Sequence, residues 1–177
     1  DDGWNNYNDT SVVDSVRSGT TLNTTGFWEF NSKFPNGLTT SSSLANKLGS
    51  DFGVWIGPRG GYNFFGSLAD ILTKSGTGSK SGGSIDVADA TYVQKFEEMA
   101  INWMHDYGVN YWKWDGFADV AQYNAFPSGE GVVGYSKEHR HMYGGQNQMY
   151  HVTDLWEKWI VLMENIRQAE KDYNIKN

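Results

Sequence analysis

The order and spacing of helix-like and strand-like segments constrain the fold of this chain more than any other feature. Apolar stripes with helical spacing occupy residues 41–48, 91–107 and 154–173. Short aromatic and β-branched runs at 51–57 and 109–115 are typical of buried strands, and residues 1–4 are typical of the carboxyl end of another strand. The two kinds of segment alternate, which indicates an α/β protein.

The connections between these segments differ in length with direction. A helix leads to the next strand within a few residues, at Gly49 and at Gly108, whereas about 30 to 40 residues separate each strand from the following helix. Long segments therefore gather at the carboxyl ends of the strands, where a (β/α)8 barrel carries its active site. A doubly wound sheet has the same polarity, but no GxGxxG sequence opens a helix after a strand here. We expect part of a (β/α)8 TIM barrel with long βα loops.

Composition narrows the class of partner. The 177 residues carry a net charge of -7 without a basic run between aromatics, which argues against a nucleic-acid partner. No apolar run approaches the roughly 18 residues that span a bilayer, and cysteine is absent. Many Trp, Tyr, Asn, Ser, Thr and Gly with few Lys and Arg are typical of a bacterial carbohydrate-active protein that is secreted or held at the cell surface. No cofactor is expected.

One aromatic stretch, residues 111–115, places two ionisable groups on the same side of a predicted strand. Side chains alternate along a strand, so Lys113 and Asp115 project one way, roughly 6.6 Å apart along the backbone, while Trp112 and Trp114 project the other way. A carboxylate beside a cation in apolar surroundings stays ionised, as a carboxylate nucleophile must. The alternative is a lysine–aspartate pair that only joins two elements.

The strand at 51–57 adds a second group of candidates. Alternation places Trp55, Gly57 and Arg59 on one face, where the tryptophan is either a plate for sugar C–H groups or ordinary barrel filling. The stretch Thr73–Ser84, rich in Ser, Gly, Thr and Lys, is expected to be a flexible excursion without chemistry. No metal site is expected, because three histidines of one predicted loop lack the spacing of known ligand motifs, namely His139, His141 and His151.

Four short motifs stand in register over the first two thirds of the chain. They are Asp1-Asp2-Gly3-Trp4, Lys33-Phe34-Pro35-Asn36-Gly37-Leu38, Gly53-Val54-Trp55-Ile56-Gly57-Pro58 and Tyr111-Trp112-Lys113-Trp114-Asp115. Their order and separation, over roughly positions 1 to 117, resemble glycoside hydrolase family 36, the α-galactosidases and melibiase-like enzymes of clan D. The resemblance implies that residues 1–177 are the front portion of a catalytic barrel, about strands two to four and their helices.

The resemblance also implies roles for individual residues. Asp115 matches the catalytic nucleophile, and Lys113 matches the lysine that binds sugar hydroxyls and holds that aspartate ionised. Asp1 and Asp2 match carboxylates that grip the C4 and C6 hydroxyls of a galactose-type ring, and Trp55 matches an aromatic of the same pocket. The implied activity is retaining hydrolysis of terminal α-linked galactose-type sugars in an oligosaccharide or glycoconjugate.

Two departures from the family pattern matter. Arg59 stands where relatives carry an acid, and it could reach a sugar hydroxyl, reach a substrate carboxylate, or pair with Asp1 or Asp2. The second carboxylic acid that retention requires follows a later strand in the family, beyond Asn177. The chain is therefore expected to be catalytically incomplete and to need the remainder of a parent polypeptide. The alternative function is a non-catalytic carbohydrate-binding domain or an inactive barrel.

Overall fold

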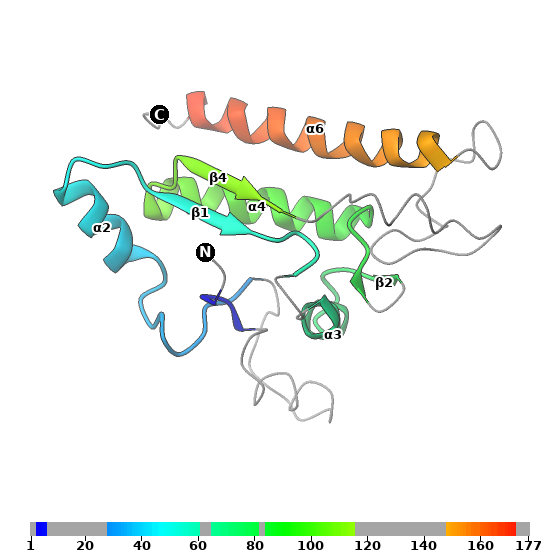
Figure 1. Ribbon diagram of the computed structural model, residues 1–177, viewed down its shortest axis with the longest axis horizontal. Coiled ribbons are helices and arrows are strands. Elements are labelled where there is room, and N and C mark those ends of the chain that lie inside the picture. Colours follow the sequence, from blue (N-terminus) through cyan, green and yellow to red (C-terminus); the bar gives the residue numbers. More distant parts are fainter. Residues whose placement is uncertain (1–2, 7–27, 61–64, 82–83, 116–147, 173–177) are drawn as a thin grey trace.

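A computed structural model describes residues 3–6, 28–60, 65–81, 84–115 and 148–172 (Figure 1). The elements follow one another as α2 (Thr39–Lys47), β1 (Gly53–Ile56), α3 (Phe65–Lys74), β2 (Lys80–Ser81), β3 (Ser84–Ile85), α4 (Ala90–Tyr107), β4 (Tyr111–Trp114) and α6 (Gln148–Asp172). Helices are present near all three predicted ranges and strands within 51–57 and 109–115, so these elements are confirmed. Helix α6 begins at Gln148, six residues before its predicted start, and therefore includes His151, which was expected in a loop.

Strands β1 and β4 form a parallel pair. Their register runs from Gly53 opposite Tyr111 to Ile56 opposite Trp114. The Asp115 backbone N–H donates to the Ile56 carbonyl at 2.9 Å, which extends the pairing just beyond β4. Parallel neighbours require a crossover connection, and α4 lies within it. The described chain thus contains one β–α–β unit, and the complete (β/α)8 barrel stays a prediction.

Helix α4 is fixed at both ends by local interactions. The Asp89 side chain caps its first turn by accepting from the Tyr92 backbone N–H at 3.0 Å. Gly108 ends it in the left-handed conformation with φ 64°, which costs glycine little, and the chain enters β4 three residues later. The side chains that α4 buries share one stripe: Tyr92, Phe96, Met99, Ala100, Trp103 and Met104.

An aromatic core joins the helices to one face of the sheet. Trp112 stacks on Trp103 of α4 with ring centroids 6.2 Å apart. Trp114 meets Phe96 at 5.3 Å and Trp159 of α6 at 5.8 Å. Figure 1 shows α4 and α6 running alongside the two paired strands, and the two helices are in contact. The helices therefore cover the face of β4 that carries its tryptophans.

The stretch Thr73–Ser84 was predicted to be a flexible excursion, and this prediction is wrong. Helix α3 extends to Lys74, and β2 pairs antiparallel with β3. The small polar residues stabilise the end of α3, because the hydroxyl groups of Ser75 and Thr77 both donate to the Leu72 carbonyl, at 3.0 and 3.1 Å. Helix α3 buries Leu68, Ala69, Ile71 and Leu72, an apolar pattern that the sequence analysis missed.

The amino-terminal segment does not continue the parallel pair. Asn5 forms an isolated antiparallel bridge with Phe30, and no strand includes residues 3–6. Trp4 is buried against Trp28 and Phe30, and its indole Nε1 donates to the Trp55 carbonyl at 3.3 Å. The segment thus packs beside β1 through a side chain, in place of the strand end that we expected. Asp1 and Asp2 lie outside the described residues.

Substitution of two tryptophans of α6 tests which of them belongs to the hydrophobic core. Trp159 is fully buried and donates from Nε1 to the Val87 carbonyl at 2.9 Å, whereas Trp156 is 41% exposed. Trp159→Ala should lower the free energy of unfolding by about 3–5 kcal/mol, because it leaves a cavity and an unpaired carbonyl. Trp156→Ala should change it by less than about 1 kcal/mol. Urea unfolding measures both values, and equal losses would contradict the assignment.

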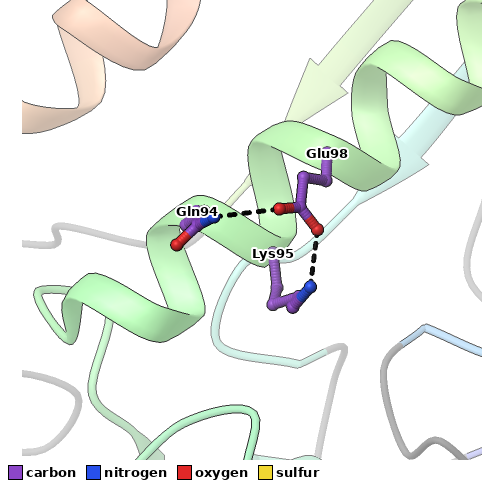
Figure 2. A network of polar contacts seen from close by, with 3 residues as sticks. All are labelled: Gln94, Lys95 and Glu98. Atoms are coloured by element: carbon purple, nitrogen blue, oxygen red, sulfur yellow. Dashed lines mark hydrogen bonds and ion pairs between the residues drawn. The ribbon is translucent and has the colours of Figure 1, made fainter.

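A polar network on the exposed side of α4 lowers the pKa of one carboxylate. Lys95 Nζ contacts Glu98 Oε2 at 2.6 Å, and Gln94 Nε2 donates to Glu98 Oε1 at 3.0 Å (Figure 2). The Lys95 contact is the main reason that the pKa of Glu98 lies below its ordinary value of 4.5. Because the folded pKa is lowered, the stabilisation exists at neutral pH and is lost as the pH falls through that pKa.

Removal of the lysine should therefore raise the pKa of Glu98. In Lys95→Met the carboxylate loses its main charge partner, and NMR titration of Glu98 should give a value closer to 4.5. Replacing Lys171, which lies in the last turn of α6, with Met is the matched control and should leave the pKa of Glu98 in place. An unchanged pKa in Lys95→Met would show that the contact in Figure 2 does not form in solution.

Candidate functional site

The candidate site lies at the carboxyl ends of β1 and β4, on the sheet face that α4 and α6 leave uncovered. Asp115 directly follows β4, is half-buried, and is tied to β1 by its backbone hydrogen bond to Ile56. Parallel strands present their carboxyl ends at one edge, so the residues that follow β1 lie beside Asp115. Trp55, Lys113, Asp115 and Arg59 are thereby brought to one region of the molecule.

The alternation predicted for residues 111–115 is confirmed. Tyr111 is 65% exposed and Lys113 is exposed, whereas Trp112 and Trp114 pack against the core. Lys113 and Asp115 therefore share the open face. Within the described part of the chain, however, no ion pair joins them. The lysine side chain extends toward solvent, so the expected role of Lys113 in holding Asp115 ionised has no direct contact to support it.

Trp55 donates a hydrogen bond to the Asp115 carboxylate. Its indole Nε1 donates to Asp115 Oδ2 at 3.4 Å, and the residue pairs across the sheet with Lys113. Val54 and Ile56, its neighbours on β1, belong to the buried core, so Trp55 lies on the other face, as alternation predicted. It is nevertheless only 8% exposed.

The turn after β1 is closely packed. Gly60 has a φ of 100° and its N–H donates to the Gly57 carbonyl at 2.7 Å. The hydroxyl group of Tyr92 in α4 donates to the Pro58 carbonyl, which fixes this turn to the first turn of the helix. Arg59 lies within it and is 6% exposed. The arginine is thus buried within the turn and is not a surface charge.

Gly57 is the residue that allows Trp55 its position. A Cβ at residue 57 would lie 2.7 Å from the Gly60 carbonyl oxygen and 3.0 Å from Trp55 Cη2. The six-membered ring of Trp55 therefore lies over Gly57, while the indole N–H reaches Asp115. Sequence analysis placed Trp55 and Gly57 on one face but missed this dependence. It also missed Trp4, whose place beside β1 requires long-range packing.

Two cavities lined by described residues lie away from Asp115. One cavity of about 410 Å³ lies between β4 and α6, and another of about 610 Å³ lies between α4 and α6. Neither is lined by Asp115, Lys113 or Trp55, and both lie on the helix side of the sheet.

Metal binding receives no support from the described residues. No three His, Asp or Glu side chains lie close enough to hold an ion among residues 3–6, 28–60, 65–81, 84–115 and 148–172. His139 and His141 lie outside these ranges. Over the same part of the chain, no helix has the length and hydropathy that a bilayer crossing demands.

Comparison with known proteins identified no family. A scan against protein-family models and searches of curated proteins and of solved structures found no match to the chain. The resemblance to glycoside hydrolase family 36 therefore rests on the four sequence motifs. Any function must be argued from the residues themselves.

Substitutions of two glycines, Gly53 at the start of β1 and Gly57 directly after it, test the packing around Trp55. Gly57→Ala should lower the free energy of unfolding by about 1–3 kcal/mol, because its Cβ would strike the Gly60 backbone. Gly53→Ala is the comparison and should cost less: its closest contact, at 2.8 Å, would be the ring of the exposed Tyr111, which can rotate away, and the Tyr111 Cβ and carbonyl oxygen lie farther off, at 3.1 and 3.2 Å. Thermal unfolding measures both, and a Gly57→Ala protein as stable as wild type would contradict the packing of this turn.

Proposed function

We propose that the chain carries the nucleophile of a retaining glycoside hydrolase that acts on terminal α-linked galactose-type sugars. The observation that supports this most is the position of Asp115, a half-buried carboxylate fixed at the carboxyl end of a parallel strand, on the face opposite the one that α4 and α6 cover. A nucleophilic carboxylate needs such a rigid mount with access from one side. The galactose-type sugar is inferred from the resemblance of the four sequence motifs to glycoside hydrolase family 36.

The proposed reaction begins with attack on the sugar. A carboxylate oxygen of Asp115 forms a bond to the anomeric carbon, and the bond from that carbon to the leaving oxygen breaks, with its electron pair passing to the leaving group. The leaving oxygen takes a proton from a second carboxylic acid, and water later hydrolyses the glycosyl ester with net retention. None of the described residues is assigned the role of the acid.

Lys113 and Arg59 have different proposed roles. The Lys113 ammonium is exposed on the same face as Asp115, so it is available to donate hydrogen bonds to sugar hydroxyls. Arg59 is buried in the turn after β1, which favours a structural or wall-forming role over a mobile contact. Asp1 and Asp2 keep the sugar-binding roles that the resemblance implies.

A substrate whose leaving group needs no proton tests the nucleophile alone, because its reaction does not require the unassigned acid. 5-Fluoro-α-galactosyl fluoride releases fluoride without protonation, and its ring fluorine slows hydrolysis of the ester that forms. Incubation with the full chain should add one fluorogalactosyl group on Asp115, located by peptide mass spectrometry. Asp115→Asn should remain unlabelled, and Lys113→Met should be labelled about tenfold more slowly because a hydrogen bond to the sugar is lost.

The alternative function, sugar binding without catalysis, predicts a different result. The open face around Asp115 could hold a sugar through Lys113 without any covalent step. Wild-type chain would then bind galactose by NMR titration but gain no mass with the fluoride. That pair of results would replace the hydrolase proposal.

A further inference from the structure

The Trp55 indole has a position that a sugar-stacking plate does not require. It is only 8% exposed, so little of its ring face is left for sugar C–H groups. Its one polar edge, the Nε1–H, is directed at Asp115 Oδ2 at 3.4 Å. The residue is therefore better suited to hold the carboxylate than to hold the substrate.

Three features fix the indole in this position. Its ring lies over Gly57, where any larger residue would collide with it. Its backbone carbonyl accepts from Trp4 Nε1 at 3.3 Å. Trp55 pairs with Lys113 of β4, and the next pair, Ile56 with Trp114, is the last before Asp115. The contact of the ring with Gly57 and the two restraints on the backbone of residue 55 thus hold the donor in place, as a preorganised group must be held.

We propose that Trp55 is a positioning residue for the Asp115 carboxylate, an inference whose catalytic part rests on the proposed function. An indole N–H is a donor only and stays neutral, so it can occupy Oδ2 without adding a charge. Oδ1 then remains as the oxygen that attacks the anomeric carbon. The 3.4 Å separation is longer than the roughly 3 Å of a tight N–H···O bond. Such bonds at catalytic groups commonly shorten when substrate binds.

The contact itself is tested without any substrate. The indole proton of Trp55 is identified in an NMR spectrum of the full chain by its absence from Trp55→Phe. In Asp115→Ala this resonance should move upfield and exchange faster with water, because its acceptor is gone. The remaining tryptophan resonances report whether the variant is folded. An unmoved Trp55 resonance in a folded Asp115→Ala protein would overturn the proposal.

The consequence for chemistry is tested by the kinetics of labelling with 5-fluoro-α-galactosyl fluoride. A positioning role predicts that Trp55→Phe lowers the maximal labelling rate about tenfold and leaves the half-saturating concentration within about twofold. A stacking role predicts the reverse pattern, which would overturn the inference. Trp156→Phe, on the exposed side of α6, is the matched control and should label as wild type does.

The two experiments separate failure of the inference from failure of the proposed function. If wild-type chain is never labelled while the Trp55 resonance responds to Asp115→Ala, the nucleophile assignment is wrong and the contact is real. If wild-type chain is labelled and Trp55→Phe is labelled at the same rate, the positioning role alone is wrong.

Discussion

The parallel pairing of β1 with β4 is the constraint on which the rest of the arrangement depends. Its register decides which side chains of the two strands share a face. Trp55 stands opposite Lys113, and Val54 and Ile56 stand opposite the two tryptophans of β4. A shift of one residue would put the aromatic side chains into solvent and the lysine into the core. The aromatic packing of α4 and α6 therefore fixes the same register that brings Trp55 to Asp115.

The two faces of the β1–β4 sheet carry different kinds of side chain, and the difference follows from the chemistry of those side chains. Indole rings bury large apolar areas and pack edge to face, so they gather against the helices. The lysine and the carboxylate are costly to bury without partners and lie on the opposite face. The four residues of β4 thus contribute tryptophans to the core on one face and Lys113 to the candidate site on the other. This close junction leaves Asp115 little freedom, since Trp114 before it is held by Phe96 and Trp159.

Much of this architecture was predictable from the sequence. Periodicity and glycine signals located α4 to within a residue and gave the correct side of β4 for Lys113. The hairpin after α3 was missed because serine and threonine in that stretch cap a helix, a role that composition does not reveal. The pairing of Lys113 with Asp115 failed as a direct contact, since spacing fixes where a long side chain starts and not where it ends. The Trp55–Asp115 contact depends on register between segments 60 residues apart, which no local pattern encodes.

Helix α4 links both halves of the site through its two ends. Near its start, the Tyr92 hydroxyl is bonded to the turn that carries Arg59. At its finish, Gly108 leads by a tight bend into the strand that ends at Asp115. The helix thus connects the turn that carries Arg59 to the strand that leads to Asp115. A change in its buried stripe that moves the helix would therefore act on both segments, even where the altered residue touches neither of them.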